Sequence, residues 1–183
     1  DEKFADENKL NYWGAVDMYL GGMEHTTLHL LYSRFWHKFF YDIGLVPTPE
    51  PYKARRGQGI VLAADGTKMS KSKGNVINPT DIIESGYGAD ALRTYVAFMA
   101  PYDMTTAWNP EGVPGAYRFI NRVWNLVQEY KISKKPGIVP DSLIHKTIKK
   151  ATVDLDKMGF NTAIASLMEY VNELYKLKTK GMT

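Results

Sequence analysis

The chain has 183 residues, which is enough for one hydrophobic core, or for one core and part of a second. Hydrophobic residues make up 44% and charged residues 23%, an ordinary composition for a soluble globular protein. The sequence contains no cysteine, which excludes disulfides, a thiolate nucleophile and cysteine-ligated zinc. No apolar run approaches the roughly 20 residues of a membrane helix, and the net charge of +3 is too small to indicate a nucleic-acid partner by itself.

Positive charge is concentrated in two segments of the chain. Six Lys or Arg residues stand against one Asp between residues 53 and 73, and six Lys stand against one Asp between residues 131 and 150. Such clusters indicate local phosphate-binding sites, with a solvated basic surface as the alternative for each. The polar first ten residues do not resemble a signal peptide, so a cytoplasmic location is expected. Because the sequence does not begin with Met, we expect it to belong to a larger protein.

The first sixty residues are predicted to contain a strand and a helix. Residues 15–20 are apolar and precede Gly21-Gly22, which is typical of a buried strand that ends in a turn. Residues 24–41 are predicted to form a helix that ends at Gly44, since glycine is the favoured C-terminal cap. The apolar face of this helix consists of Leu28, Leu31, Phe35 and Phe39.

A second strand is expected at residues 59–62. It precedes an Asp65-Gly66 turn and a polar, lysine-rich loop. Asn78 and Pro79 have the residue types of an N-cap and a first helical residue. Short helices are expected at 80–84 and 89–100. Two strands do not form a stable open sheet, so the other strands are expected elsewhere in the protein.

Residues 101–114 contain three prolines and Gly112 and are interpreted as a domain junction. Only helices are predicted beyond it, at 115–131, 141–157 and 162–178, with a linker at 134–137. An α/β part followed by helices indicates two domains. Their predicted bounds are residues 1–105 and 106–183.

The most specific feature is the run Lys68–Ser72, of sequence KMSKS, which is followed by Lys73. Three lysines on a short loop can place ammonium groups on the oxygens of a polyphosphate. The hydroxyls of Ser70 and Ser72 can donate hydrogen bonds to the same oxygens. The spacing of a Walker loop is absent. For three lysines alone, a solvated basic loop would be the better interpretation.

A second constellation follows the first predicted strand. Gly21 and Gly22 allow a close approach of backbone to a nucleotide, and the carboxylate of Glu24 can accept hydrogen bonds from ribose hydroxyls. His25 and His29 are four residues apart and are predicted to share one helical face. Their spacing is zinc-like, but no third ligand is evident, so no metal site is predicted. The alternative is that both histidines are packed core residues.

The KMSKS run is identical to the signature of class I aminoacyl-tRNA synthetases, and residues 59–62, 78–79 and 88–93 are similar to that family's flanking segments. Residues 17–29 resemble the leucyl-tRNA synthetases more than the isoleucyl, valyl or methionyl enzymes. The resemblance covers about residues 11–178. It implies the second half of a Rossmann-like nucleotide-binding domain with parallel strands, followed by the first helices of an anticodon-binding bundle.

The resemblance also implies roles for individual residues. Lys68 and Lys71 would contact the ATP phosphates and act in catalysis, and Tyr19, His25 and His29 would line the leucine pocket. Magnesium is expected with ATP. Arg118 and Arg122 could contact tRNA, with salt bridges between helices as the alternative. The ATP-binding residues would be Gly21, Gly22, Glu24, Val61, Lys68, Met69, Ser70, Lys71 and Ser72.

The implied reaction is that of a leucine–tRNA ligase. Leucine and ATP form leucyl-adenylate and pyrophosphate, and the leucyl group is then transferred to tRNA(Leu). The His-Ile-Gly-His signature and the editing domain of the family are absent from these residues. The chain is therefore expected to need the N-terminal half of a synthetase and to be inactive alone. The alternatives are a non-catalytic tRNA-binding or assembly module, and a complementing subunit of a split synthetase.

Overall fold

A computed structural model describes residues 3–132 and 139–179. The chain divides into two compact units, Asp1–Ile60 and Val61–Thr183. Short parallel strands occur among helices as far as residue 107, and helices follow. This order confirms the predicted fold class, a partial Rossmann-like α/β fold followed by a helical segment. None of the helices described here has the length and hydropathy needed to cross a membrane.

The first unit is built on one pair of parallel strands. β1 and β2 pair from Tyr19↔Arg55 to Gly22↔Gln58, and an isolated parallel bridge joins Val16 to Tyr52. The elements of this unit are α1 (Glu7–Trp13), β1 (Tyr19–Gly22), the 3-10 helix η1 (Met23–Thr26), α2 (His29–Asp42) and β2 (Arg55–Gln58).

Three predictions for this unit need correction. The strand begins at Tyr19 and not at residue 15, because Ala15 has a φ of 51°, which no extended strand allows. The single helix expected at 24–41 is divided into η1 and α2, because Leu28 (φ −114°, ψ −103°) leaves the helical region. Helix α1 was not predicted, although Asp6 is its N-cap and accepts a hydrogen bond from Lys9 N–H (3.0 Å).

The apolar face of α2 is exposed. Leu31 and Phe35 keep 65% and 66% of their surface accessible, whereas Leu30 is buried. The predicted apolar face, Leu28, Leu31, Phe35 and Phe39, therefore points away from the β1–β2 pair and toward solvent. Exposed large apolar side chains at helical spacing are typical of a surface that packs against another element or chain.

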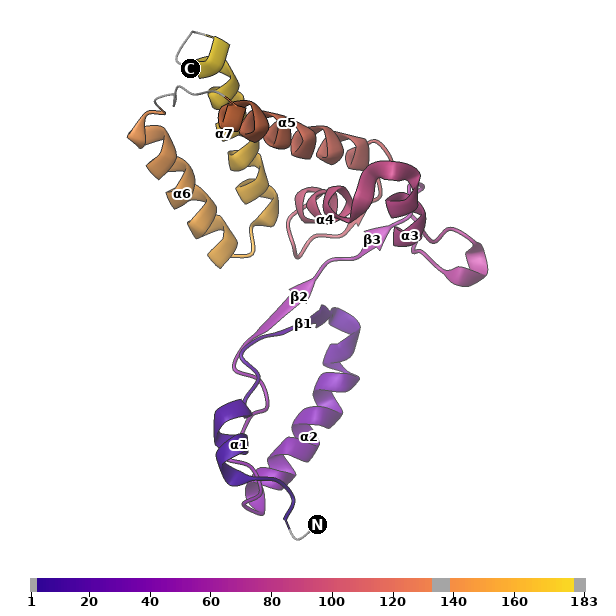
Figure 1. Cartoon of the computed structure of the whole chain (residues 1–183). Coiled ribbons are helices and arrows are strands. Elements are labelled where there is room, and N and C mark those ends of the chain that lie inside the picture. Colours follow the sequence, from indigo (N-terminus) through magenta and orange to yellow (C-terminus); the bar gives the residue numbers. More distant parts are fainter. Residues whose placement is uncertain (1–2, 133–138, 180–183) are drawn as a thin grey trace. The chain divides into compact units, whose positions relative to one another are not determined.

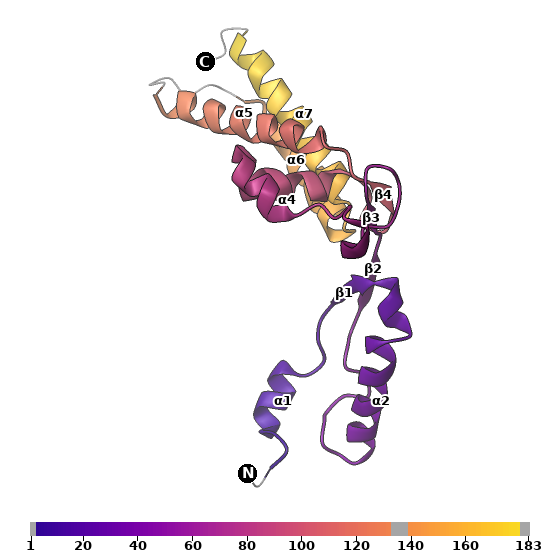
Figure 2. The ribbon, with the colours of Figure 1, turned by 90° about the vertical axis from the view of Figure 1, so that its right-hand side faces the viewer.

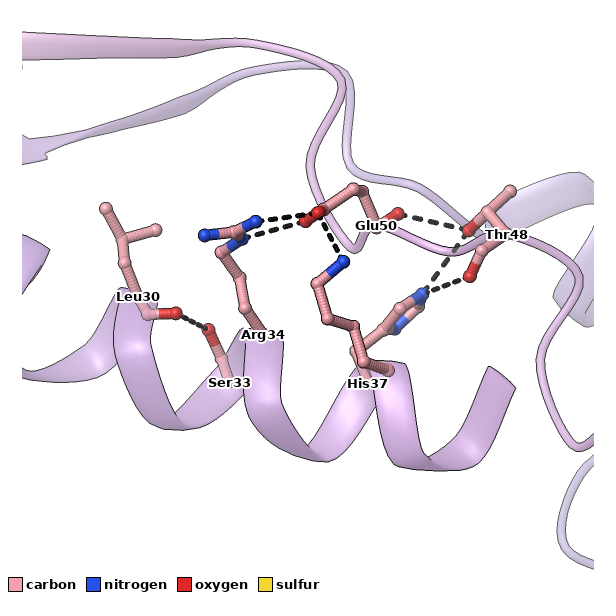
Figure 3. Close-up of polar contacts among 7 residues, drawn as sticks. Leu30, Ser33, Arg34, His37, Thr48 and Glu50 are labelled. Atoms are coloured by element: carbon pink, nitrogen blue, oxygen red, sulfur yellow. Dashed lines mark hydrogen bonds and ion pairs between the residues drawn. The ribbon is translucent and has the colours of Figure 1, made fainter. Parts of the chain in front are cut away.

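The segment between α2 and β2 turns back along the helix (Figure 2). Gly44 ends α2 with a φ of 75°, and its N–H donates to Tyr41 O (3.0 Å), which agrees with its predicted capping position. Five residues then hold the returning segment to the helix, and we name them the Glu50 cluster (Figure 3). They are Arg34, His37, Lys38, Thr48 and Glu50.

The second unit contains one further pair of parallel strands and most of the helices (Figure 1). β3 and β4 pair through Val61↔Thr106 and Leu62↔Ala107. Helix α5 packs on α4 and α7, and α6 packs on α7. The elements are β3 (Val61–Leu62), η2 (Lys71–Lys73), α3 (Pro79–Ile82), the π-helical turn η3 (Ile83–Tyr87), α4 (Gly88–Phe98), β4 (Thr106–Ala107), α5 (Gly112–Ile132), α6 (Asp141–Asp156) and α7 (Phe160–Thr179).

Some predictions made from local sequence signals in this unit are confirmed, and others are not. Asn78 caps α3 by accepting a hydrogen bond from Thr80 N–H (3.1 Å), and Pro79 is the first helical residue, as predicted. The strand expected at 59–62 is wrong in its bounds, because strand pairing is interrupted at residues 59–60. Strand β4 was not predicted within the proline-rich junction. The predicted linker at 134–137 lies outside the described residues.

The core of the second unit joins α4 to α5. Ala91, Tyr95, Val113 and Ala116 are its buried residues. The ring of Tyr95 lies against Gly112, where an added Cβ would stand 2.5 Å from Tyr95 Cδ2. This contact allows α5 to begin at Gly112, three residues before its predicted start. The core contains residues from both sides of the predicted domain boundary at 105/106, and that boundary stays a prediction.

Candidate functional site

The start of β1 and the start of α2 bring three of the predicted site residues together. The rings of Tyr19 and His29 stack with centroids 5.5 Å apart, and the Tyr19 hydroxyl lies 3.1 Å from His29 Nδ1 in a hydrogen bond. The ring of His25 meets that of His29 edge-on, with centroids 6.5 Å apart. Tyr19, His25 and His29 therefore form one cluster of polar rings.

The sequence-based explanation for the proximity of His25 and His29 is wrong. His25 and His29 do not share one helical face, since His25 lies in η1 and His29 is the first residue of α2. The turn between the two helices brings their rings together instead. His25 Nδ1 is buried and has no hydrogen-bond partner among the described residues. A buried polar atom without a partner is destabilising, so this nitrogen is an unsatisfied polar group of the ring cluster.

Two tyrosines that were not predicted complete the ring cluster. The ring of Tyr32 meets His29 edge-on with centroids 5.3 Å apart. The ring of Tyr52 meets Tyr19 edge-on at 4.9 Å, and its hydroxyl donates to Ser33 Oγ (3.0 Å). Tyr32 follows His29 by three residues, which is a helical neighbour distance that could have identified it. Tyr52 carries no such signal, because a strand pairing places it there.

The glycines at the end of β1 allow side chains to lie against the backbone. A Cβ added at Gly22 would stand 2.6 Å from Glu24 Cδ, and one added at Gly21 would stand 3.3 Å from the Tyr19 ring. The first distance cannot occur between real atoms, so only glycine permits the observed position of the Glu24 carboxylate. Glu24 is itself exposed to solvent. The strand end therefore presents an exposed carboxylate that lies against the buried backbone of Gly22.

The KMSKS run forms an ordered loop between β3 and α3 (Figure 1). Asp65 begins this loop by accepting hydrogen bonds from Thr67 N–H (2.9 Å) and Thr67 Oγ1 (2.8 Å). Ser70 Oγ and Ser72 Oγ share a hydrogen bond of 2.8 Å. Lys68 and Lys71 are exposed, while Met69 is half-buried and Val61 is paired in β3. The loop therefore presents ammonium groups to solvent from a hydrogen-bonded backbone.

The charge of Asp65 distinguishes one lysine of the loop from the other two. Hydrogen bonds from the Thr67 backbone and side chain hold the pKa of Asp65 below its ordinary value, and the positive charge of Lys73 lowers it further. Lys73 therefore interacts electrostatically with the loop itself. Lys68 and Lys71 are the two lysines for which a phosphate-binding role was predicted.

The predicted tRNA-contact residues differ in their surroundings. Arg122 on α5 donates to Asn172 Oδ1 on α7 (2.9 Å), and its guanidinium lies 4.8 Å from the centroid of the Tyr175 ring. Tyr175 in turn donates to Arg122 O (2.9 Å). These contacts favour the alternative for Arg122, a bond between helices. Arg118 is exposed on the same helix.

No group of three or more His, Asp or Glu side chains gathers as metal ligands within residues 3–132 and 139–179. The ring cluster, Gly21, Gly22 and Glu24 belong to the first unit, and the KMSKS loop belongs to the second.

Parallel strands, a glycine-containing strand end with a nearby carboxylate, and a lysine loop after a strand are typical of nucleotide-binding proteins with a Rossmann-like fold. A family model described as tRNA synthetases class I (I, L, M and V) matches residues 3–109, which is more than half of the chain. The chain therefore belongs to the class I tRNA synthetase family.

Two solved structures show similarity over nearly the whole chain. The agnB2 LeuRS of Agrobacterium radiobacter K84, in a ternary complex with tRNA and LeuAMS, is 35% identical with a TM-score of 0.79 over 90% of this chain. The methionyl-tRNA synthetase of Mycobacterium tuberculosis, bound by methionyl-adenylate, is 21% identical with a TM-score of 0.67 over 92% of this chain, and shows a shared fold. The chain spans 23% of the first protein's length and 35% of the second's.

Proposed function

We propose that this chain is part of a leucine–tRNA ligase. Residues 1–105 would be the second half of its catalytic domain, and residues 106–183 the first helices of its anticodon-binding bundle. The observation that carries the proposal is the ring cluster of Tyr19, His25 and His29, whose residues lie on both sides of Gly21-Gly22 in the sequence. This arrangement occurs in a chain that is 35% identical to a LeuRS. Tyrosine and histidine rings of this kind would line the leucine pocket.

In the proposed reaction, the leucine carboxylate attacks the α-phosphorus of ATP, a new P–O bond forms, and the bond to pyrophosphate breaks. Negative charge develops on the leaving pyrophosphate. Lys68 and Lys71 would place their ammonium groups on its oxygens, because both are exposed on an ordered loop. Ser70 and Ser72 would donate hydrogen bonds there. No covalent nucleophile is needed, since positioning and charge stabilisation drive this class of reaction.

The nucleoside part of ATP would lie at the end of β1. Gly21 and Gly22 carry no side chain that would block a nucleotide, and the exposed Glu24 carboxylate would accept hydrogen bonds from the ribose hydroxyls. Val61 and Met69 would complete the ATP contacts. Magnesium bound to ATP would neutralise phosphate charge.

The side-chain pocket would select leucine by shape. The His25 nitrogen that lacks a partner would pair with a ligand or a bound water. One methylene group contributes only about 1–3 kcal/mol of discrimination, so such a pocket alone cannot reject every close analogue.

The proposed partners are leucine, ATP, tRNA(Leu) and the N-terminal half of the synthetase. The exposed aromatic face of α2 would pack on that half, and Arg118 would contact tRNA. The proposed location is the cytoplasm. Alone, the chain would lack one wall of the ATP site and would be inactive in aminoacylation.

Calorimetric titration with a leucyl-sulfamoyl-adenosine analogue tests the proposal, with the isoleucyl analogue as control. The titration is run on the chain alone and after mixing with the N-terminal half of a leucyl-tRNA synthetase. Binding of the leucyl form, at least tenfold tighter than the isoleucyl form, is expected in the mixture. Equal binding of both forms, or binding of neither in the mixture, would contradict the assignment to leucine.

A further inference from the structure

Asn75 is bonded to three separate points of the KMSKS loop. Its Oδ1 accepts a hydrogen bond from Ser70 N–H (2.8 Å). Its Nδ2 donates to Thr67 Oγ1 (3.0 Å) and to Lys68 O (3.3 Å). The half-buried side-chain amide of Asn75 therefore uses both its donor and its acceptor atoms. These bonds hold the Thr67 side chain and the backbone of Lys68 and Ser70 on the opposite side of the loop.

The backbone before Asn75 is shaped for this contact. Residues Lys71–Lys73 form the 3-10 turn η2, and Gly74 follows with a φ of 65°. Its N–H donates to Lys71 O (3.2 Å). The left-handed backbone conformation at Gly74 reverses the chain direction. Most residues other than glycine and asparagine adopt this conformation only at an energetic cost. This reversal brings residue 75 back to residues 67–70.

The bonds of Asn75 continue into a chain of hydrogen bonds across the loop. Thr67 Oγ1, which accepts from Asn75, donates to Asp65 Oδ1 (2.8 Å). Lys68 also bridges to Leu62 at the end of β3. The network therefore runs from β3 to the far side of the loop and includes the backbone of Lys68 and of Ser70, the residue before Lys71.

We propose that Asn75 is a positioning residue that fixes the spacing between Lys68 and Lys71. The loop then presents both lysines to the pyrophosphate moiety from a hydrogen-bonded turn. This inference rests on the proposed function for its ligand. Asn75 touches no reacting atom, and its effect is transmitted through the Lys68 carbonyl and the Ser70 amide.

Three variants of the chain test this role. Asn75→Ala removes all three bonds. Asn75→Asp retains an acceptor for Ser70 N–H but removes the amide donor to Lys68 O. Asn78→Ala is the matched control, because it removes a nearby asparagine amide that caps α3 and makes no contact with residues 67–72 in the described structure.

The first measurement is hydrogen exchange of the Ser70 amide in the ligand-free chain. Asn75→Ala is expected to raise the exchange rate at least about fivefold, because one hydrogen bond contributes on the order of 1 kcal/mol. Asn75→Asp and Asn78→Ala are expected to keep the Ser70 protection. A Ser70 amide that is unprotected in the unaltered chain, or unaffected by Asn75→Ala, overturns the proposal.

The second measurement separates positioning from general stability. Titration with inorganic pyrophosphate is expected to show weaker binding for Asn75→Ala than for Asn78→Ala at equal thermal stability. With the N-terminal half added, Asn75→Ala is expected to have a lower kcat in leucine-dependent ATP–pyrophosphate exchange and an unchanged KM for leucine. Pyrophosphate affinity that does not depend on Asn75 overturns the proposal. An unaltered chain that binds pyrophosphate but shows no leucine dependence would contradict only the proposed function.

Discussion

The Tyr19 hydroxyl and the His29 Nδ1 atom are joined by a 3.1 Å hydrogen bond while their rings stack. Tyr19→Phe keeps the ring and removes this bond. We expect a loss of about 0.5–1.5 kcal/mol in the free energy of unfolding of the first unit, and weaker binding of the leucyl-adenylate analogue in the presence of the N-terminal half. Denaturant unfolding and calorimetry measure the two effects.

Tyr41→Phe is the control, because Tyr41 is exposed near the end of the same helix. Nitrogen-15 NMR of His29 reports its tautomer directly. An unchanged tautomer and unchanged analogue affinity in Tyr19→Phe would show that the bond does not order the ring cluster.

The Glu50 cluster makes stability depend on pH. Arg34 donates to both Glu50 oxygens (2.8 and 2.7 Å), and Lys38 lies 2.7 Å from the same carboxylate. Hydrogen bonds from Arg34 and then Lys38 lower the pKa of Glu50 from its ordinary 4.5 to about 2. The charged form is favoured in the folded state, so its contribution is present above pH 4.5 and is lost as pH falls toward 2.

Glu50→Gln tests this contribution. We expect the variant to have a lower Tm than the unaltered chain at pH 7, and the difference to shrink as the pH falls toward 2, where Glu50 becomes protonated. Because the carboxylate is exposed, high salt should reduce the difference. A Tm difference that is constant from pH 7 to pH 2 would show that the ion pairs do not hold the segment to α2.

Gly22→Ala tests the strand end. The added methyl group would overlap the observed position of the Glu24 carboxylate, which must then move. We expect weaker binding of the adenylate analogue with little change in Tm, because Glu24 is exposed and can reorient. Gly115→Ala is the control, because its added Cβ would stand no closer than 3.9 Å to a neighbouring atom. A Gly22→Ala variant that binds the analogue as tightly as the unaltered chain would exclude Glu24 from the ribose contact.

The three lysines of the loop are expected to differ in function. Lys68→Met and Lys71→Met should each lower kcat for ATP–pyrophosphate exchange about 10²–10³-fold, the usual effect of removing one charge-stabilising group from a transition state. Lys73→Met should have a much smaller effect, because Lys73 lies outside the pair of lysines proposed to contact the phosphates. Exchange is measured with the N-terminal half present. Equal losses for all three variants would contradict this division.

Gly112→Ala tests the contact between α4 and α5. An added Cβ would stand 2.5 Å from Tyr95 Cδ2, so the ring or the start of α5 must shift. We expect a loss of about 1–3 kcal/mol in the free energy of unfolding, which is typical of overpacking. Gly115→Ala is the matched control, since it places its Cβ no closer than 3.9 Å to a neighbouring atom. Equal stability of the two variants would show that the Tyr95 ring moves freely.

Several features could be predicted because they depend on neighbouring residues alone. Gly44 and Gly66 need a positive φ, and Asn78-Pro79 is a local capping signal, so each was found where predicted. The run Lys68–Ser72 is identical to the signature of the family, and this identity predicted the family without any structure.

Other features depend on contacts between distant residues and gave no local signal. β2 contains Arg55, Arg56 and Gly57, which have little strand propensity, and it forms because β1 offers a partner. Tyr52 lies beside Tyr19 because of that same pairing. The split between η1 and α2 was hidden because residues 24–41 keep a helical pattern of apolar residues across the break.

A partner that covers the exposed apolar face of α2 would also affect the ring cluster. α2 begins at His29, so any surface that covers Leu31 and Phe35 binds the same helix that holds the cluster together. By mass action, such a surface adds RT ln(1 + [L]/Kd) to the stability of that helix. A partner that covers this face would therefore also stabilise the start of the helix, where His29 of the ring cluster lies.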